Sequence, residues 1–112
     1  MINEKNNSTE RRQAYRIVYP KEYHPSLIIR DKEFDILDLS ETGLRFKLLE
    51  SVKLPGDLFH AKVKIHDGSS IEILGRIIRI AGDQAAMFMV VKKIPYQIIL
   101  SEQAYLRQKD EV

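Results

Sequence analysis

The sequence contains no cysteine, and its formal net charge is only +2 over 112 residues. The absence of cysteine excludes disulfide bonds, thiolate nucleophiles and cysteine-based zinc or iron–sulfur sites. No apolar run approaches the ~18 residues of a membrane-spanning helix, so we expect no membrane insertion. The charge is too small to indicate general nucleic-acid binding, but 18 basic residues leave room for a local anion-binding patch.

Length and composition indicate one soluble globular domain. A chain of 112 residues with 44% hydrophobic and 30% charged residues suffices for one hydrophobic core and is too short for two ordinary domains. Residues 1–10 are polar and predict a flexible tail, and residues 11–112 form the domain. The tail lacks the apolar stretch of a secretory signal, so we expect a cytoplasmic protein.

Seven short segments show the alternation of apolar and polar residues that is typical of β-strands. They span residues 15–19, 27–29, 34–39, 43–48, 59–65, 71–80 and 85–91, so that strands occupy the stretch 15–91. The Asp67-Gly68 and Gly82-Asp83 pairs predict tight turns. Apolar parity changes near Gly75, which predicts a bulge or bend there. Six or seven such strands predict a small antiparallel barrel.

A change to helical spacing follows the last strand. Apolar and small residues recur at intervals of four, three and four from Ile94 to Tyr105, which predicts a C-terminal helix over residues 95–109. We assign Ile94, Ile98, Ser101 and Tyr105 to the face that packs on the sheet or closes the barrel mouth. Pro95 suits the first turn, where its missing N–H is not needed.

Two polar motifs stand out against this background. Asp38-x-Ser40-x-x-Gly43 is expected about 0.02 times in a shuffled chain of this composition. Arg12-x-x-x-Arg16, directly preceded by Arg11, is expected about 0.5 times and means little alone. Taken singly, the motifs are typical of a capped turn and a solvated charge run.

The position of Asp38 and Ser40 on a strand predicts that they share one face. Side chains alternate along a strand, so Leu37 and Leu39 would face the core while Asp38 and Ser40 face away from it and reach one ligand. Gly43 would allow close backbone approach or a turn with positive φ into the next strand.

With both motifs present in this order, the sequence resembles the PilZ domain family, bacterial receptors for cyclic di-GMP. Arg12 and Arg16 match the family's Arg-x-x-x-Arg, and Asp38, Ser40 and Gly43 match its Asp/Asn-x-Ser-x-x-Gly, with a looser match over residues 75–79 and 86–88. The resemblance implies a mainly β fold, a six-stranded antiparallel barrel with a C-terminal α-helix. It also implies a flexible N-terminal switch loop, residues 11–16, that reorganises on ligand binding.

The same resemblance implies a ligand site for cyclic di-GMP, with no metal and no other cofactor. Its residues would be Arg11, Arg12, Arg16, Asp38, Ser40 and Gly43. Arginine can bind phosphates and guanine O6/N7 bidentately, and a carboxylate such as Asp38 accepts from guanine N1–H and N2–H₂. In the family, the residue before the arginine pair influences whether one or two dinucleotides bind, and Arg11 is compatible with a stacked pair. Tyr15 stands where many members carry proline.

Other polar residues do not suggest a second chemistry. No nucleophile, base and orienting acid form a catalytic set, so we expect no enzyme. His24, His60 and His66 lack the spacing of metal ligands and are interpreted as surface residues. Lys62 and Lys64 are interpreted as solvated. Arg76 and Arg79 are either solvent-facing strand positions or ligand contacts.

The sequence therefore predicts a stand-alone cyclic di-GMP receptor that acts through an unidentified downstream protein. Two alternatives stay open. One is a small nucleic-acid-binding barrel that uses Arg and Lys on phosphate groups. The other is a PilZ-like adaptor that works by protein contact alone.

Overall fold

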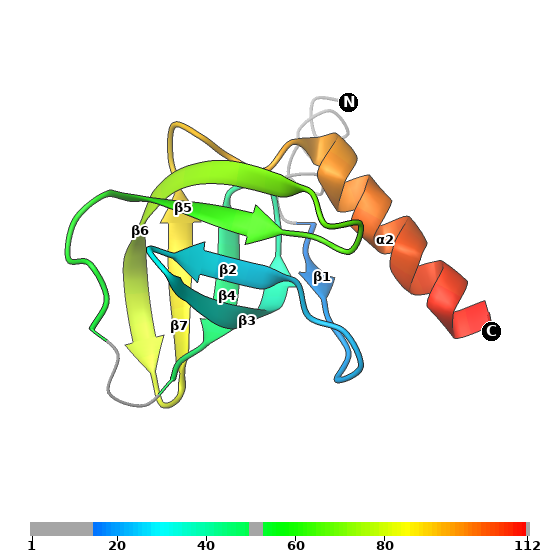
Figure 1. Cartoon of the computed structure of the whole chain (residues 1–112), viewed down its shortest axis with the longest axis horizontal. Coiled ribbons are helices and arrows are strands. Elements are labelled where there is room, and N and C mark those ends of the chain that lie inside the picture. The colour runs from blue at the N-terminus through cyan, green and yellow to red at the C-terminus, as the bar shows by residue number, and fades with distance from the viewer. Residues whose placement is uncertain (1–14, 50–52, 112) are drawn as a thin grey trace, which may run out of the picture.

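The computed structural model describes residues 15–49 and 53–111 of the chain, which form a small β-barrel beside one helix (Figure 1). Within those residues the elements are β1 (Ile17–Val18), β2 (Ser26–Ile29), β3 (Lys32–Leu39), β4 (Gly43–Lys47), β5 (Phe59–Lys64), β6 (Ser70–Ala81), β7 (Gln84–Met89) and α2 (Tyr96–Glu111). The C-terminal helix predicted over 95–109 is confirmed. No helix of this described part is long and apolar enough to cross a membrane.

Six strands close into an antiparallel barrel, as predicted. The strand order is β3-β2-β5-β6-β7-β4, and β4 pairs back with β3. Closure requires β3 to pair along its whole length. Its first half pairs with β2, its second half with β4, and the short β1 joins the second half where β2 has ended. Among the described strands, β1 therefore pairs with β3 alone, next to Asp38.

Alternation places the apolar side chains of each strand inside the barrel. On β5, Ala61 and Val63 are buried while Lys62 and Lys64 are exposed, as the sequence predicts. Phe34 of β3 and Phe46 of β4 meet edge to face in the core, with ring centroids 5.2 Å apart. Burial of these apolar side chains in one cluster, to which all six barrel strands contribute, is what holds the barrel together.

The structure corrects the predicted faces of β3. Ile36 and Leu39 are fully buried, whereas Leu37 is only half-buried, because a register shift lies between Ile36 and Asp38 in the pairing with β4. This irregularity breaks the strict alternation of the strand. Asp38 and Ser40 are themselves only 2% exposed, so the motif lies under other groups instead of on open surface.

The parity change in β6 arises further along than predicted. The register shift lies between Ile77 and Arg79, not at Gly75. Gly75 is buried and serves close strand packing, since a Cβ there would lie 2.3 Å from the backbone oxygen of Phe88. The predicted turn glycines are confirmed, with φ of 88° at Gly68 and 63° at Gly82.

Helix α2 uses a face that differs from the predicted one at a single position. Ile94 and Ile99 are buried and Ile98 packs against the core, but Ser101 is exposed. The residue after it, Glu102, is 0% exposed. The backbone N–H groups of Ile98 and Ile99 both donate to the Pro95 carbonyl, which starts the first turn.

Glu102 is held by donors from two separate parts of the chain, residues 19–23 and His66. Tyr19 Oη donates to Oε1 at 2.8 Å and Tyr23 Oη donates to the same oxygen at 3.1 Å. The other oxygen contacts the backbone N–H of His66 at 3.2 Å and also its Nδ1. The His66 ring stacks on Tyr105, with centroids 4.3 Å apart. The interpretation of His66 as a surface residue is therefore wrong, and the helix is joined to the barrel through a buried carboxylate.

This cluster predicts loss of stability in alkali. Burial, followed by the nearby negative charge of Glu102, raises the pKa of Tyr19 and of Tyr23 above the ordinary value of 10.0. Below about pH 10 both states keep these protons, so stability does not change on their account. Above it the unfolded chain loses them first, and the free energy of unfolding should fall, for Tyr19 by up to roughly 1.4 kcal/mol near pH 11.

Urea unfolding at about pH 8 and pH 11 measures this effect. In Tyr19→Phe the hydroxyl is gone, so the difference between the two pH values should shrink. An equal difference in both proteins would contradict the prediction.

Candidate functional site

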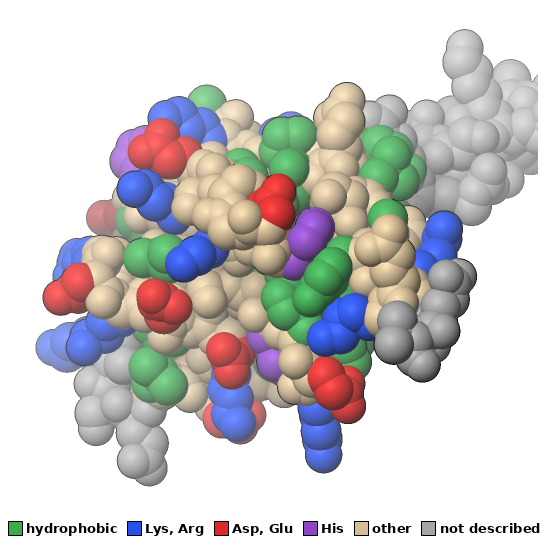
Figure 2. All heavy atoms as spheres, turned by 45° about the vertical axis from the view of Figure 1, so that its right-hand side comes forward, with side chains coloured by type: hydrophobic (Ala, Val, Ile, Leu, Met, Phe, Trp, Pro, Cys, Tyr) green, Lys and Arg blue, Asp and Glu red, His purple; other side chains and the backbone are tan. Residues whose placement is uncertain are grey.

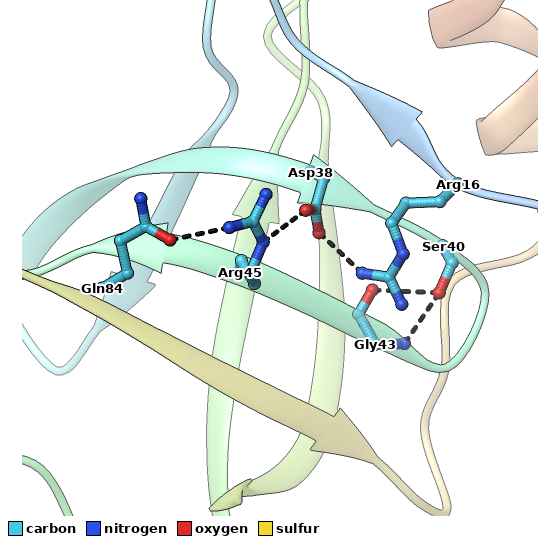
Figure 3. A network of polar contacts seen from close by, with 6 residues as sticks. All are labelled: Arg16, Asp38, Ser40, Gly43, Arg45 and Gln84. Carbon is cyan, nitrogen blue, oxygen red and sulfur yellow. Dashed lines mark hydrogen bonds and ion pairs between the residues drawn. The ribbon is translucent and has the colours of Figure 1, made fainter. Parts of the chain in front are cut away.

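Arg16 of the first predicted motif meets the residues of the second motif at one place on the barrel (Figure 3). Arg16, directly before β1, donates from Nη1 to Asp38 Oδ1 of β3 at 2.6 Å. These residues are 22 positions apart in the sequence. Gly43 begins β4 just across the turn, and the Arg16 guanidinium lies over it, 3.8 Å from where a Cβ would be. Arg16, Asp38, Ser40 and Gly43 thus form one cluster, as their pairing in the sequence predicts.

A second arginine, which the sequence interpretation missed, completes the contacts of Asp38. Arg45 of β4 donates from Nε to Asp38 Oδ2 at 2.5 Å and from Nη1 to Gln84 Oε1 of β7 at 2.7 Å. From the sequence, Arg45 is only one of the polar residues that alternate with apolar ones in the strand predicted over 43–48. The available signal was that it lies two positions after Gly43 and therefore on the same face.

Asp38 is consequently a buried carboxylate between two half-exposed guanidinium groups. Its side chain is 2% exposed and those of Arg16 and Arg45 are each 43% exposed. The charges compensate each other where Asp38 is shielded from water, which keeps the carboxylate tolerable there. The two arginines keep wet surfaces from which they can turn toward another anion.

The turn between β3 and β4 is closed by the motif itself. The backbone N–H of Ser40 donates to the Gly43 carbonyl at 2.8 Å, and the Gly43 N–H donates to Ser40 Oγ at 3.1 Å. Gly43 is not among the residues with positive φ, so that part of the expectation is wrong. Because Gly43 has no side chain, the Arg16 guanidinium can lie directly over its backbone.

This turn is also connected to the start of the C-terminal helix. The Thr42 carbonyl accepts from the N–H of Met89 at 2.7 Å, and the Glu41 carbonyl accepts from the N–H of Ile94 at 3.0 Å. Met89 ends β7 and Ile94 immediately precedes Pro95 and α2. Displacement of the motif turn would therefore pull on the segment that leads into the helix.

The remaining predicted arginines lie elsewhere. Arg11 and Arg12, with most of the 11–16 switch loop, lie outside the described residues. Arg76 and Arg79 are exposed on β6. Arg76 is paired with Phe88, which is paired with Gly43 on its other side. Contact of either arginine with a ligand stays a prediction.

Comparison with known proteins bears on the identity of this cluster. The protein-family model described as the PilZ domain matches residues 10–103. The chain belongs to the PilZ domain family. Among solved structures, this PilZ domain is similar to the crystal structure of an uncharacterised Legionella protein, with a TM-score of 0.58 and 14% identity. That match covers 87% of this chain and 96% of the other, and at this identity it shows the fold alone. No curated protein matches the sequence.

PilZ domains are generally receptors for cyclic di-GMP, and the family is one of binding and adaptor domains. In the described part of this PilZ domain, no three His, Asp or Glu side chains gather as a metal site. On the face shown in Figure 2, basic and acidic side chains are interspersed, and they do not form the continuous basic stripe that nucleic-acid binding favours.

Proposed function

We propose that this PilZ domain binds cyclic di-GMP through Arg11, Arg12, Arg16, Asp38, Ser40 and Gly43. The observation that carries the proposal is the contact of Arg16 with Asp38, which joins the two motifs into one cluster. Asp38 can accept from the N1–H and N2–H₂ groups of guanine, a use that an anion-only site would not need. The arginines supply planar donors for the phosphates and flat faces for the bases.

Binding at this site requires a rearrangement, which supports a switching role. A ligand reaches Asp38 only when Arg16 or Arg45 moves away, because the carboxylate is 2% exposed beneath them. Phosphate groups offer both arginines an alternative anion, so ligand favours the arrangement in which the guanidinium groups have turned. Such differential binding of two arrangements is what any ligand-driven switch needs.

We further propose that the signal leaves through β1 and α2 to a downstream protein. β1 follows Arg16 directly, and Tyr19 just beyond it is bonded to Glu102 of the helix. The motif turn is bonded to the segment before the same helix. Both halves of the site thus connect to α2, whose outer face includes exposed Leu100.

Titration calorimetry with cyclic di-GMP tests the site. We expect Arg16→Ala and Asp38→Ala each to weaken binding by about 10- to 100-fold, since each removes a charge-assisted hydrogen bond. Arg12→Ala should behave in the same way. The matched controls are Arg107→Ala on α2 and Asp35→Ala on β3, which remove the same charges from exposed positions and should leave affinity unchanged. Two dinucleotides per chain would support the role of Arg11 in holding a stacked pair.

Three outcomes would contradict the proposal. Unchanged affinity in Arg16→Ala and Asp38→Ala would exclude this cluster as the site. An absence of binding heat together with tight binding of single-stranded DNA or RNA would favour a nucleic-acid-binding barrel. Binding of neither ligand would favour a ligand-independent adaptor.

A further inference from the structure

A small pocket continues the site beyond Arg45. It has a volume of about 180 Å³ and is lined by Arg45, Arg79, Gln84 and three alanines, Ala81, Ala85 and Ala86. Arg45 on β4 and Arg79 on β6 both pair with Ala86 on the strand between them. Neighbouring strands are ~4.8 Å apart, so the backbones at Arg45 and Arg79 are separated by roughly 10 Å. The side chain between them is only the methyl group of Ala86. The result is a shallow trough with a cationic side chain on each wall.

The polar groups around this trough are arranged to donate. Arg45 uses one N–H on Asp38 and one on Gln84, two of the five N–H donors that a guanidinium carries. Because Gln84 Oε1 accepts from Arg45, its NH₂ group is the end left to donate to another molecule. Arg79 is exposed, and its guanidinium group carries only hydrogen-bond donors. Nearby carboxylates are Asp38, already shared by two arginines, and exposed Asp83 in the β6–β7 turn.

A pocket lined by hydrogen-bond donors favours a ligand group that carries hydrogen-bond acceptors. Its volume is below the roughly 300 Å³ at which pockets enclose a small organic ligand, so it fits one group of a ligand and not a whole nucleotide. A phosphate is compact and anionic, and its oxygens match two guanidinium forks and an amide NH₂. Asp38 at the other end of Arg45 presents only acceptors. Arg45 thus lies between two subsites. Asp38 on one side suits the N–H donors of a base, and the pocket on the other side suits anionic oxygens.

We infer that the Arg45–Arg79–Gln84 pocket is a phosphate subsite of the ligand site, and that Arg79 is a binding residue. The inference rests on the proposed binding of cyclic di-GMP at Asp38. When a guanine takes the place of Arg45 on Asp38, the released guanidinium has the neighbouring pocket to turn into. There it binds a phosphate together with Arg79.

Arg79 variants test the subsite in titration calorimetry with cyclic di-GMP. Arg79→Ala should weaken binding about tenfold, whereas Arg107→Ala, which removes the same charge from α2, should have no effect. Arg79→Lys should weaken it only about two- to threefold, because lysine still binds phosphate as a point charge. The side chain is exposed, so all three variants should melt at the wild-type temperature.

Each remaining outcome overturns part of the inference. If Arg79→Ala matches Arg107→Ala while Asp38→Ala still loses affinity, the subsite is wrong and the proposed function stands. If Arg79→Lys loses as much affinity as Arg79→Ala, the pocket binds the planar edge of a base and not a phosphate. If wild-type protein gives no binding heat, the proposed function and the subsite both fail.

Discussion

Glu102→Ala is expected to lower the free energy of unfolding by about 3 kcal/mol. The carboxylate is 0% exposed and accepts from Tyr19, Tyr23 and His66. Truncation leaves these donors without their acceptor, and a buried unsatisfied donor such as Tyr19 costs about 1–3 kcal/mol. Burial of the carboxylate is itself unfavourable, and its removal offsets part of this loss. The net effect should still be large, because the segment after β1 and the β5–β6 turn both lose the carboxylate that joins them to α2.

Glu72→Ala is the matched control for this change. Glu72 lies on β6, its side chain is 59% exposed, and its contact with Lys92 is 3.4 Å long. An exposed pair of this kind contributes little, so we expect a change within about 0.5 kcal/mol. Urea unfolding of both variants near neutral pH measures the difference. Equal stability of the two variants would show that Glu102 does not hold the helix to the barrel.

Gly75→Ala is expected to cost about 3 kcal/mol, through collision with backbone and not through loss of a contact. The added Cβ would lie 2.3 Å from the Phe88 oxygen and 3.0 Å from the Met89 Cα. A rotamer change relieves a clash with a side chain, but here β6 must separate from β7. Both strands belong to the closed ring, so the displacement spreads to their neighbours.

Gly56→Ala tests whether the loss of stability is specific to position 75 or follows from replacing any glycine of the chain by alanine. A Cβ at Gly56 meets no atom within 4 Å, and its φ lies outside the left-handed region. We expect little change or a gain of a few tenths of a kcal/mol, because alanine restricts the unfolded chain. Thermal melting of the two variants compares them directly. A Gly75→Ala protein as stable as Gly56→Ala would contradict the tight β6–β7 packing.

The barrel and the helix were predictable because they follow from local pattern. Alternation marks β5 along its whole length, and the Asp67-Gly68 turn predicts the hairpin that follows. Spacing of three and four marks α2. Such patterns indicate which face of a strand or helix is apolar. Few architectures bury the apolar faces of six short strands together, and a closed barrel is one of them.

Two of the errors occur where a distant contact overrides local pattern. Glu102 lies outside the predicted apolar face of α2, yet a hydrogen bond from Tyr19, 83 positions away, allows it to be buried. The parity of β3 fails at Leu37, since β3 must serve β1, β2 and β4 at once. Periodicity within one strand contains no information about which strands lie beside it.

The candidate site was predicted in part for a related reason. Asp38, Ser40 and Gly43 lie in one short motif, and chance alone made that motif unlikely to be accidental. Arg45 contacts Asp38 across a strand pair, and Gln84 contacts Arg45 from 39 positions away. Their part in the cluster depends on the register of β4 between β3 and β7. Register becomes known only when the barrel is assembled.

The turn from Ser40 to Gly43 joins the two strands whose pairing closes the barrel. The cluster around this turn is assembled from β3, β4 and β7, so a ligand held there binds the folded barrel and not the unfolded chain, and mass action makes occupancy a source of folding free energy. Occupied receptors would unfold less often and escape proteolysis for longer. Under the proposed function, the concentration of cyclic di-GMP in a cell would then influence the amount of receptor as well as its state.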